Sequence, residues 1–150
     1  MYLELSKKSY LDQVMQEGSE ALTKVRTIIS KVESENLYKG KGGEIMRTGV
    51  CHLIHAISIS KISLGDQLSE ELVQQLVANF KHPNQEIQDE ATKSFESFCK
   101  SYYGPDSEVS DQDVVVKHIT KLFEPSKNDP NTAATRGYNM SFGVLSPKIL

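Results

Sequence analysis

The chain has 150 residues, of which 38% are hydrophobic and 25% charged, as in an ordinary globular domain. Its net charge of −3 implies no general affinity for nucleic acid or for anionic membranes. No apolar run approaches the roughly 20 residues that a membrane-spanning helix needs, and charged residues interrupt positions 1–11 where a signal peptide would be apolar. Cys51 and Cys99 lie inside helical patterns and are expected to be buried free thiols of an intracellular protein.

Apolar residues recur at three- and four-residue steps over most of the chain, which predicts amphipathic helices and no strand. The expected helical stretches cover residues 10–32, 44–60, 69–80, 87–102, 111–123 and 132–145. Gly18 is a candidate kink in the first helix. Ser69 is expected to cap the third helix and Ser110 or Asp111 the fifth. Pro147 is expected to close the last helix, and Val114 is assigned to helix despite its β propensity.

A repeat with a period of about 40 residues is visible in the helix starts. The starts at Ile45, Ile87 and Ala133 are 42 and 46 residues apart, and the small residues Gly49, Ala91 and Gly137 each follow four positions later. Two helices per 40–47 residues is the signature of HEAT and armadillo repeats. We assign Gly49 and Gly137 to close helix packing, because a larger side chain there would hold the paired helix away.

These observations predict an all-α fold of HEAT/armadillo-like helical repeats. About three helix pairs would form a short right-handed solenoid, in one domain over residues 1–150 that is a fragment of a longer chain. A generic six-helix bundle with coincidental spacing is the alternative.

The glycine-rich stretch from Gly40 to Gly43 runs directly into the second helix, where Glu44 suits the positive end of the helix dipole. Backbone N–H groups before a helix can cradle a phosphate. The spacing of a P-loop is absent and no strand precedes the stretch, so a flexible turn is favoured over a nucleotide site.

Cys51 and His55 lie one helical turn apart, with His52 between them, which is compatible with two metal ligands. A zinc site needs more ligands, and no second Cys/His pair is placed to supply them. No nucleophile, base and orienting group stand together either. The sequence therefore predicts no metal, no cofactor and no enzyme activity.

Lys39, Lys41, Arg47 and Lys61 give the second helix and its flanks a local positive charge in an acidic protein. Such a cluster is in general a solvated surface. The more specific interpretation is a binding patch for an acidic protein.

Two motifs resemble a known family. The segment Lys41-Gly42-Gly43-Glu44-Ile45-Met46-Arg47, followed by Val50-Cys51, looks like the G-G-E-x-M-R-x-x-V-C segment of tubulin-folding cofactor D. The segment Arg136-Gly137-Tyr138 with Ser141-Phe142-Gly143-Val144-Leu145 resembles that family's later R-G-[YFW]-x-x-[AS]-[LF]-G-x-L helix. Gly42, Gly43, Glu44, Gly49 and Gly137 are the structural positions of these motifs.

The resemblance implies a segment of a large HEAT-repeat chaperone of the cytoplasm and the microtubule cytoskeleton. Such chaperones hold β-tubulin and act with cofactors C and E and an Arf-like small GTPase to assemble or dismantle the αβ-tubulin dimer. Lys39, Lys41, Arg47 and Arg136 are then the candidate protein-binding residues, although hydrogen bonds from Arg136 to loop carbonyls are slightly favoured.

Two other functions remain open. The first is a HEAT scaffold in transport or trafficking. The second is a helical regulator of an Arf-like GTPase, for which Arg47 and Arg136 are the candidate arginine fingers.

Overall fold

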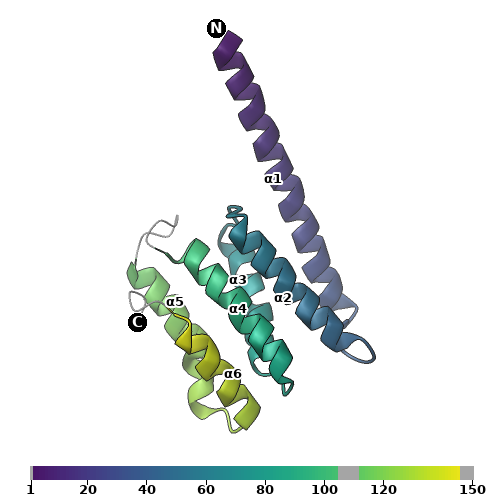
Figure 1. The fold of residues 1–150 in the computed structure, drawn as a ribbon, viewed down its shortest axis with the longest axis vertical. Coiled ribbons are helices and arrows are strands. Elements are labelled where there is room, and N and C mark those ends of the chain that lie inside the picture. Colours follow the sequence, from purple (N-terminus) through teal and green to yellow (C-terminus); the bar gives the residue numbers. More distant parts are fainter. Residues whose placement is uncertain (1, 105–111, 146–150) are drawn as a thin grey trace. The chain divides into compact units, whose positions relative to one another are not determined.

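The computed structural model describes the backbone of residues 2–104 and 112–145 (Figure 1). Within these residues the chain is helical and has no strand, so the all-α prediction is confirmed. The elements are α1 (Tyr2–Ser34), α2 (Gly43–Ile59), α3 (Asp66–Phe80), α4 (Gln85–Tyr102), α5 (Gln112–Phe123), the 3₁₀ helix η1 (Glu124–Asn128) and α6 (Thr132–Gly143). None of the described helices is long and apolar enough to cross a lipid bilayer.

The chain divides into two compact units, residues 1–40 and 41–150. The first unit contains α1, which runs from Tyr2 to Ser34 without interruption at Gly18, the candidate kink. The second unit contains the other five α-helices. The prediction of a single domain over residues 1–150 stays a prediction.

In the second unit, α4 is the central helix and packs against α2, α3 and α6. The helices α2, α4 and α6 lie side by side as one row (Figure 1). Each of them is the second helix of an expected pair. Within the second unit, this row of alternate helices is consistent with the helical-repeat fold that the spacing predicts.

Aromatic side chains from four helices join the second and third pairs. Phe80 of α3 contacts the rings of Phe95 and Tyr138 edge-on, with centroids 5.5 and 6.1 Å apart. Phe123 of α5 lies against Phe95, Tyr138 and Phe142 at 5.5–6.1 Å. Edge-to-face pairs of this kind add stability beyond the area that they bury. The core therefore runs from α3 through α4 to α5 and α6.

Asparagine side chains cap the starts of two helices. Asn84 caps α4 by accepting from the backbone N–H of Glu86, and Asn131 caps α6 by accepting from Ala133 and Ala134. Ser69 is not the cap of α3, because that helix already begins at Asp66 after Gly65, whose φ of 69° favours glycine. The expected caps Ser110 and Asp111, and Pro147, lie outside the described residues.

Candidate functional site

The glycine-rich turn before α2 contains two glycines with positive φ angles. Gly40 and Gly42 have φ values of 80° and 94°, and Gly42 is the N-cap of α2. Glu44 stands in the first helical turn, as predicted. Lys39 and Lys41 are exposed on this turn, Lys39 in the first unit and Lys41 in the second. The two glycines therefore have a conformational role, and the lysines are accessible to a partner.

Arg47 of α2 is hydrogen bonded to a buried amide of α3. Its Nη1 donates to Oδ1 of Asn79 at 2.7 Å. Asn79 is fully buried, and its Nδ2 donates to Sγ of Cys51 at 3.3 Å. Hydrogen bonds from a charged donor are stronger than neutral ones. Arg47 therefore ties α2 to the carboxyl end of α3.

Arg136 of α6 makes a similar link on the other side of α4. Its Nε donates to Oε1 of the fully buried Gln88 at 2.6 Å, and its Nη2 donates to the carbonyl of Pro83 at 3.1 Å. Gln88 Nε2 in turn donates to the carbonyls of Phe80 at 2.8 Å and Ala133 at 2.7 Å. The hydrogen bond to a loop carbonyl that the sequence favours for Arg136 is thus present.

Gly137 lies directly against the end of α3. A Cβ atom at this position would be 1.9 Å from the Phe80 carbonyl oxygen and 2.9 Å from Gln88 Nε2. The close packing expected here is therefore found, and no other residue fits without movement of the α3 backbone.

Gly49 has the opposite environment, and the packing role expected for it is wrong. It is exposed, and a Cβ there would meet nothing within 4 Å. Ile45, at the start of the helical pattern of α2, is 77% exposed although it is apolar. The buried face of α2 is instead formed by Val50, Cys51, Ile54, Ile57 and Ser58.

The two arginine networks meet at the α3–α4 turn, residues 79–88. Arg47 binds its start through Asn79, while Arg136 binds its middle through Pro83 and its end through Gln88. His82 Nδ1 accepts from the backbone N–H of Asn84 inside the turn at 3.2 Å. Burial and the nearby Arg47 charge lower the pKa of His82, so its ring is neutral near pH 7. The arginines of both motifs thus fix the same turn.

The histidines of α2 contact α4. His52 Nε2 is 3.0 Å from Glu90 Oε2, and His55 Nδ1 is 2.8 Å from Ser97 Oγ. Burial raises the pKa of the Cys51 thiol to about 11, which disfavours the thiolate that a metal would bind. Among the described residues, no group of three or more His, Cys, Asp and Glu could hold a metal ion.

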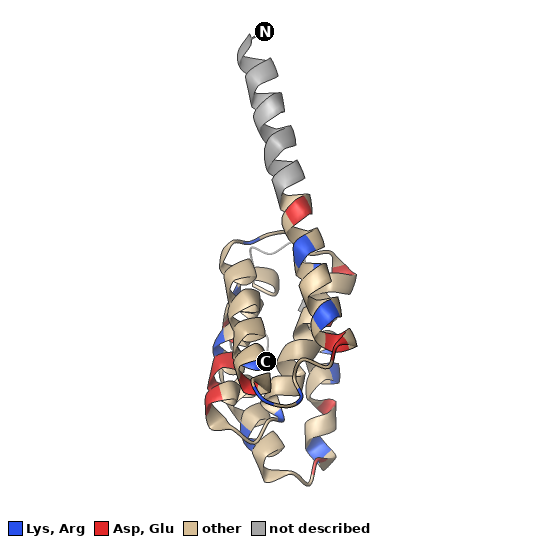
Figure 2. Ribbon diagram, turned by 90° about the vertical axis from the view of Figure 1, so that its right-hand side faces the viewer, with Lys and Arg blue, Asp and Glu red and all other residues tan. Residues whose placement is uncertain are grey.

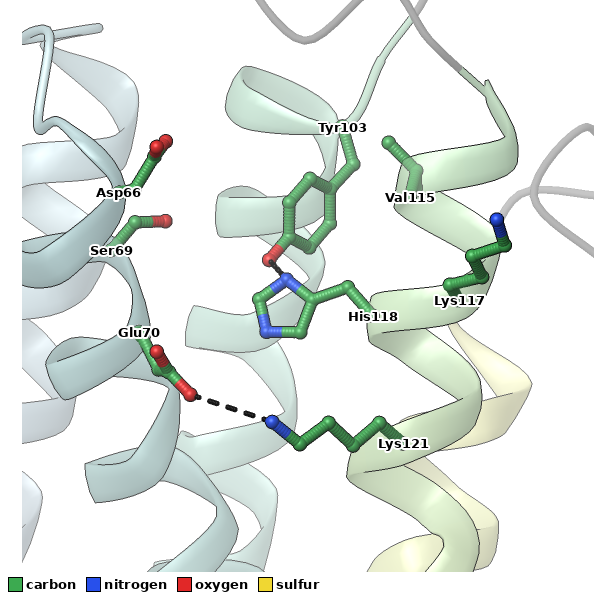
Figure 3. Close-up of a pocket in the computed structure, with 8 residues that line it drawn as sticks. All are labelled: Asp66, Ser69, Glu70, Tyr103, Val115, Lys117, His118 and Lys121. Atoms are coloured by element: carbon green, nitrogen blue, oxygen red, sulfur yellow. Dashed lines mark hydrogen bonds and ion pairs between the residues drawn. The ribbon is translucent and has the colours of Figure 1, made fainter.

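A groove that sequence reasoning missed lies between α3 and α5 (Figure 3). We call it the α3–α5 groove. Its larger part has a volume of about 400 Å³ and is lined by Asp66, Ser69, Glu70, Tyr103, Val115, Lys117, His118 and Lys121. Tyr103 and His118 are hydrogen bonded at 2.8 Å on its floor. The only signals in the sequence are the i, i+4 pairs Asp66/Glu70 and Lys117/Lys121, which put like charges on one face of each helix.

Charged residues elsewhere are mixed rather than separated by sign. Figure 2 shows lysines and arginines interspersed with aspartates and glutamates along the helices. Within the described residues, the ion pairs on α4 are Glu90 with Lys93 at 2.7 Å and Glu96 with Lys100 at 2.6 Å. A recognition surface on this protein must therefore depend on local arrangement more than on a broad electric field.

Comparison with known proteins finds similarity to a chaperone. The chain is 22% identical over 185 residues to "Tubulin-specific chaperone D" of Dictyostelium discoideum, and the match covers 78% of this chain and 12% of that protein. No family model matches the chain, and no solved structure matches it. The chain is therefore similar to a short part of a tubulin-specific chaperone, of which it spans about an eighth of the length.

Proposed function

We propose that this chain is a protein-binding segment of a tubulin-folding chaperone cofactor. It would contact β-tubulin while the αβ-tubulin dimer is assembled or dismantled in the cytoplasm. The observation that carries the proposal is the similarity to a tubulin-specific chaperone over 78% of the chain. Cofactors C and E and an Arf-like small GTPase are the further partners that this role would bring.

The helical row of α2, α4 and α6 gives the segment a suitable form. A row of parallel helices presents a continuous surface to a large folded partner. Lys39 and Lys41 are exposed and are the residues that we propose for electrostatic contact with an acidic partner surface. Arg47 and Arg136 would support recognition mainly by holding the α3–α4 turn, since each already donates to acceptors within the chain.

Co-elution with αβ-tubulin on a sizing column, at low and at moderate salt, tests the proposal. Binding that weakens with salt is expected, because screening reduces the attraction between exposed charges. The double variant Lys39→Glu/Lys41→Glu should slow association. The control Lys24→Glu/Lys127→Glu changes the net charge equally at exposed sites and should bind like the parent chain. Absence of binding at both salt concentrations would refute the tubulin contact.

The competing role of an Arf-like GTPase regulator makes a different prediction. An arginine finger has to reach the transferred phosphate of a partner's nucleotide. Both candidate arginines would first have to leave Asn79, Gln88 and Pro83. We therefore expect no acceleration when the chain is added to an Arf-like protein in a single-turnover GTPase assay, and acceleration that Arg47→Ala or Arg136→Ala abolishes would favour the regulator.

A further inference from the structure

The ring contacts of the four histidines respond differently to protonation. His52 Nε2 faces a carboxylate of α4 at 3.0 Å, and a proton on the ring would strengthen that contact. The rings of His55 and His118 contact hydroxyl groups, which can accept a hydrogen bond as well as donate one. His82 Nδ1 instead accepts from the backbone N–H of Asn84 at 3.2 Å. A backbone N–H can only donate, so a protonated His82 ring loses this bond.

The bond from Asn84 to His82 closes the α3–α4 turn across Pro83. A side chain that accepts from the N–H two residues later forms the kind of local turn that Asn and Asp side chains also form. Asn84 is the N-cap of α4, and its side chain accepts from the backbone N–H of Glu86. The Pro83 carbonyl accepts from Arg136 of α6. The His82 ring therefore fixes the residue at which α4 begins and spans the residue to which α6 is tied.

The surroundings of the His82 ring oppose protonation. Burial lowers its pKa below the usual 6.5, and the charge of Arg47 on α2 lowers it further, while Glu44 on the same helix opposes the shift. Two more basic side chains lie along the turn. The exposed Lys81 precedes the ring in the chain, and Arg136 of α6 donates to the carbonyl that follows it. Protonation therefore costs free energy in the folded state and removes the acceptor of the turn at the same time.

We propose that the α3–α4 turn is a pH-sensitive element that loosens when His82 takes up a proton. The Asn84 N–H then loses its acceptor and turns to solvent, and the Pro83 carbonyl is no longer held towards Arg136. Because the pKa of His82 is lowered in the folded state, the contribution of this bond to the free energy of unfolding is complete above pH 6.5 and is lost as the pH falls below it. The inference requires only the turn and goes beyond the proposed function, since it holds whether or not the chain binds tubulin.

Nitrogen NMR of the His82 ring, together with hydrogen exchange of the Asn84 amide, tests the proposal. At pH 7.5 the ring should carry its proton on Nε2, because Nδ1 accepts the Asn84 N–H. At pH 5, after correction for the intrinsic exchange rate, the Asn84 amide should lose about two- to tenfold of its protection, the range for one hydrogen bond. The amide of Phe95 in the middle of α4 should stay protected, which excludes global unfolding. A proton on Nδ1 at pH 7.5, or equal protection of Asn84 at both pH values, would overturn the proposal.

Two substitutions of His82 separate loss of the acceptor from loss of the ring. His82→Asn keeps a neutral acceptor for the N–H two residues later and does not titrate, so the Asn84 amide should be equally protected at pH 7.5 and pH 5. His82→Leu has no acceptor and should show at pH 7.5 the low protection that the parent chain shows at pH 5. The control His52→Asn changes an exposed histidine and should keep the pH dependence of the parent chain. A full pH dependence in His82→Asn would assign the effect to another group and refute the role of His82.

Discussion

Arg136 Nε donates to the buried Oε1 of Gln88 at 2.6 Å, and this bond connects the third helix pair to the second. Removal of either residue leaves polar atoms of the other residue, or of its neighbours, without a hydrogen-bond partner. Arg136→Ala leaves the Gln88 oxygen without this donor, and Gln88→Leu leaves the Phe80 and Ala133 carbonyls without theirs. Each single variant should lose about 1–3 kcal/mol of unfolding free energy.

Urea denaturation of the two single variants and of the double variant measures the coupling. Because the residues share one network, the double variant should lose less than the two single losses combined, with an interaction energy of about 0.5–3 kcal/mol. Strict additivity would show that the hydrogen bond contributes nothing to stability.

The two motif glycines should respond oppositely to alanine. At Gly137 an added Cβ would lie 1.9 Å from the Phe80 carbonyl oxygen, so Gly137→Ala should cost on the order of 1–3 kcal/mol. At Gly49 the Cβ enters open space, and Gly49→Ala should stabilise α2 by about 0.5–1 kcal/mol, since alanine loses less backbone entropy in a helix. Urea midpoints of the pair give the result, and a stabilised Gly137→Ala would contradict the packing.

The buried thiols should be chemically silent in the folded chain. Both cysteines are free and buried. Burial raises the pKa of Cys51 from 9.0 to about 11, and it raises the pKa of Cys99 as well. At pH 8 a thiol-specific disulfide reagent should label neither residue until urea unfolds the protein. Rapid labelling of the native chain would show that α2 and α4 open readily.

The raised pKa of Cys51 also makes the free energy of unfolding depend on pH in the alkaline range. The folded state keeps the Cys51 proton that the unfolded chain releases near pH 9, so the stabilisation is complete below that pH and is lost as the pH rises towards about 11. Cys51→Ala should flatten the loss of stability over this interval. An unchanged slope in that variant would assign the dependence to other groups.

His118 should make the protein sensitive to mild acid. Burial lowers its pKa, opposed by the Glu70 charge and reinforced by Lys121. The unfolded chain therefore takes up a proton near pH 6.5 that the folded state resists, and the contribution of His118 is present above pH 6.5 and lost as the pH falls. Between pH 7 and pH 5, the melting temperature of His118→Asn should fall less than that of the parent chain. The variant His55→Asn, which changes an exposed histidine, is the control. Equal slopes in all three proteins would be evidence against this role.

The helices of this protein could be predicted well because their apolar residues follow the helical period closely. The prediction of helix at Val114 holds within α5, where the three-four rhythm continues to Phe123. The start of α3 was misplaced at Ser69, because a good capping residue three positions inside a helix looks like a start. The residues that mark the start of α3 are Gly65 and Asp66.

The functions of individual residues were harder to predict, since they depend on helices far apart in the chain. Gly49 and Gly137 occupy equivalent places in the repeat, yet only Gly137 meets a neighbouring carbonyl. Asn79 and Gln88 were not identified, although a fully buried amide must find partners within the fold. The α3–α5 groove joins residues about 50 positions apart, and no local pattern indicates that their helices stand across from one another.

The shared carbonyl of Phe80 affects how this stack of helices comes apart. Repeat proteins can fray from an end, one repeat at a time, when each repeat depends only on its neighbour's surface. Here Gln88 bonds at once to α3 and to the first turn of α6, and Gly137 sits on the same carbonyl. Loss of α6 would therefore remove the hydrogen bonds of the Gln88 amide to Arg136 and to the Ala133 carbonyl, and only the bond to the Phe80 carbonyl would remain. We expect backbone amides of α4 and α6 to exchange with deuterium in one cooperative event, so that the second and third pairs behave as a single foldon.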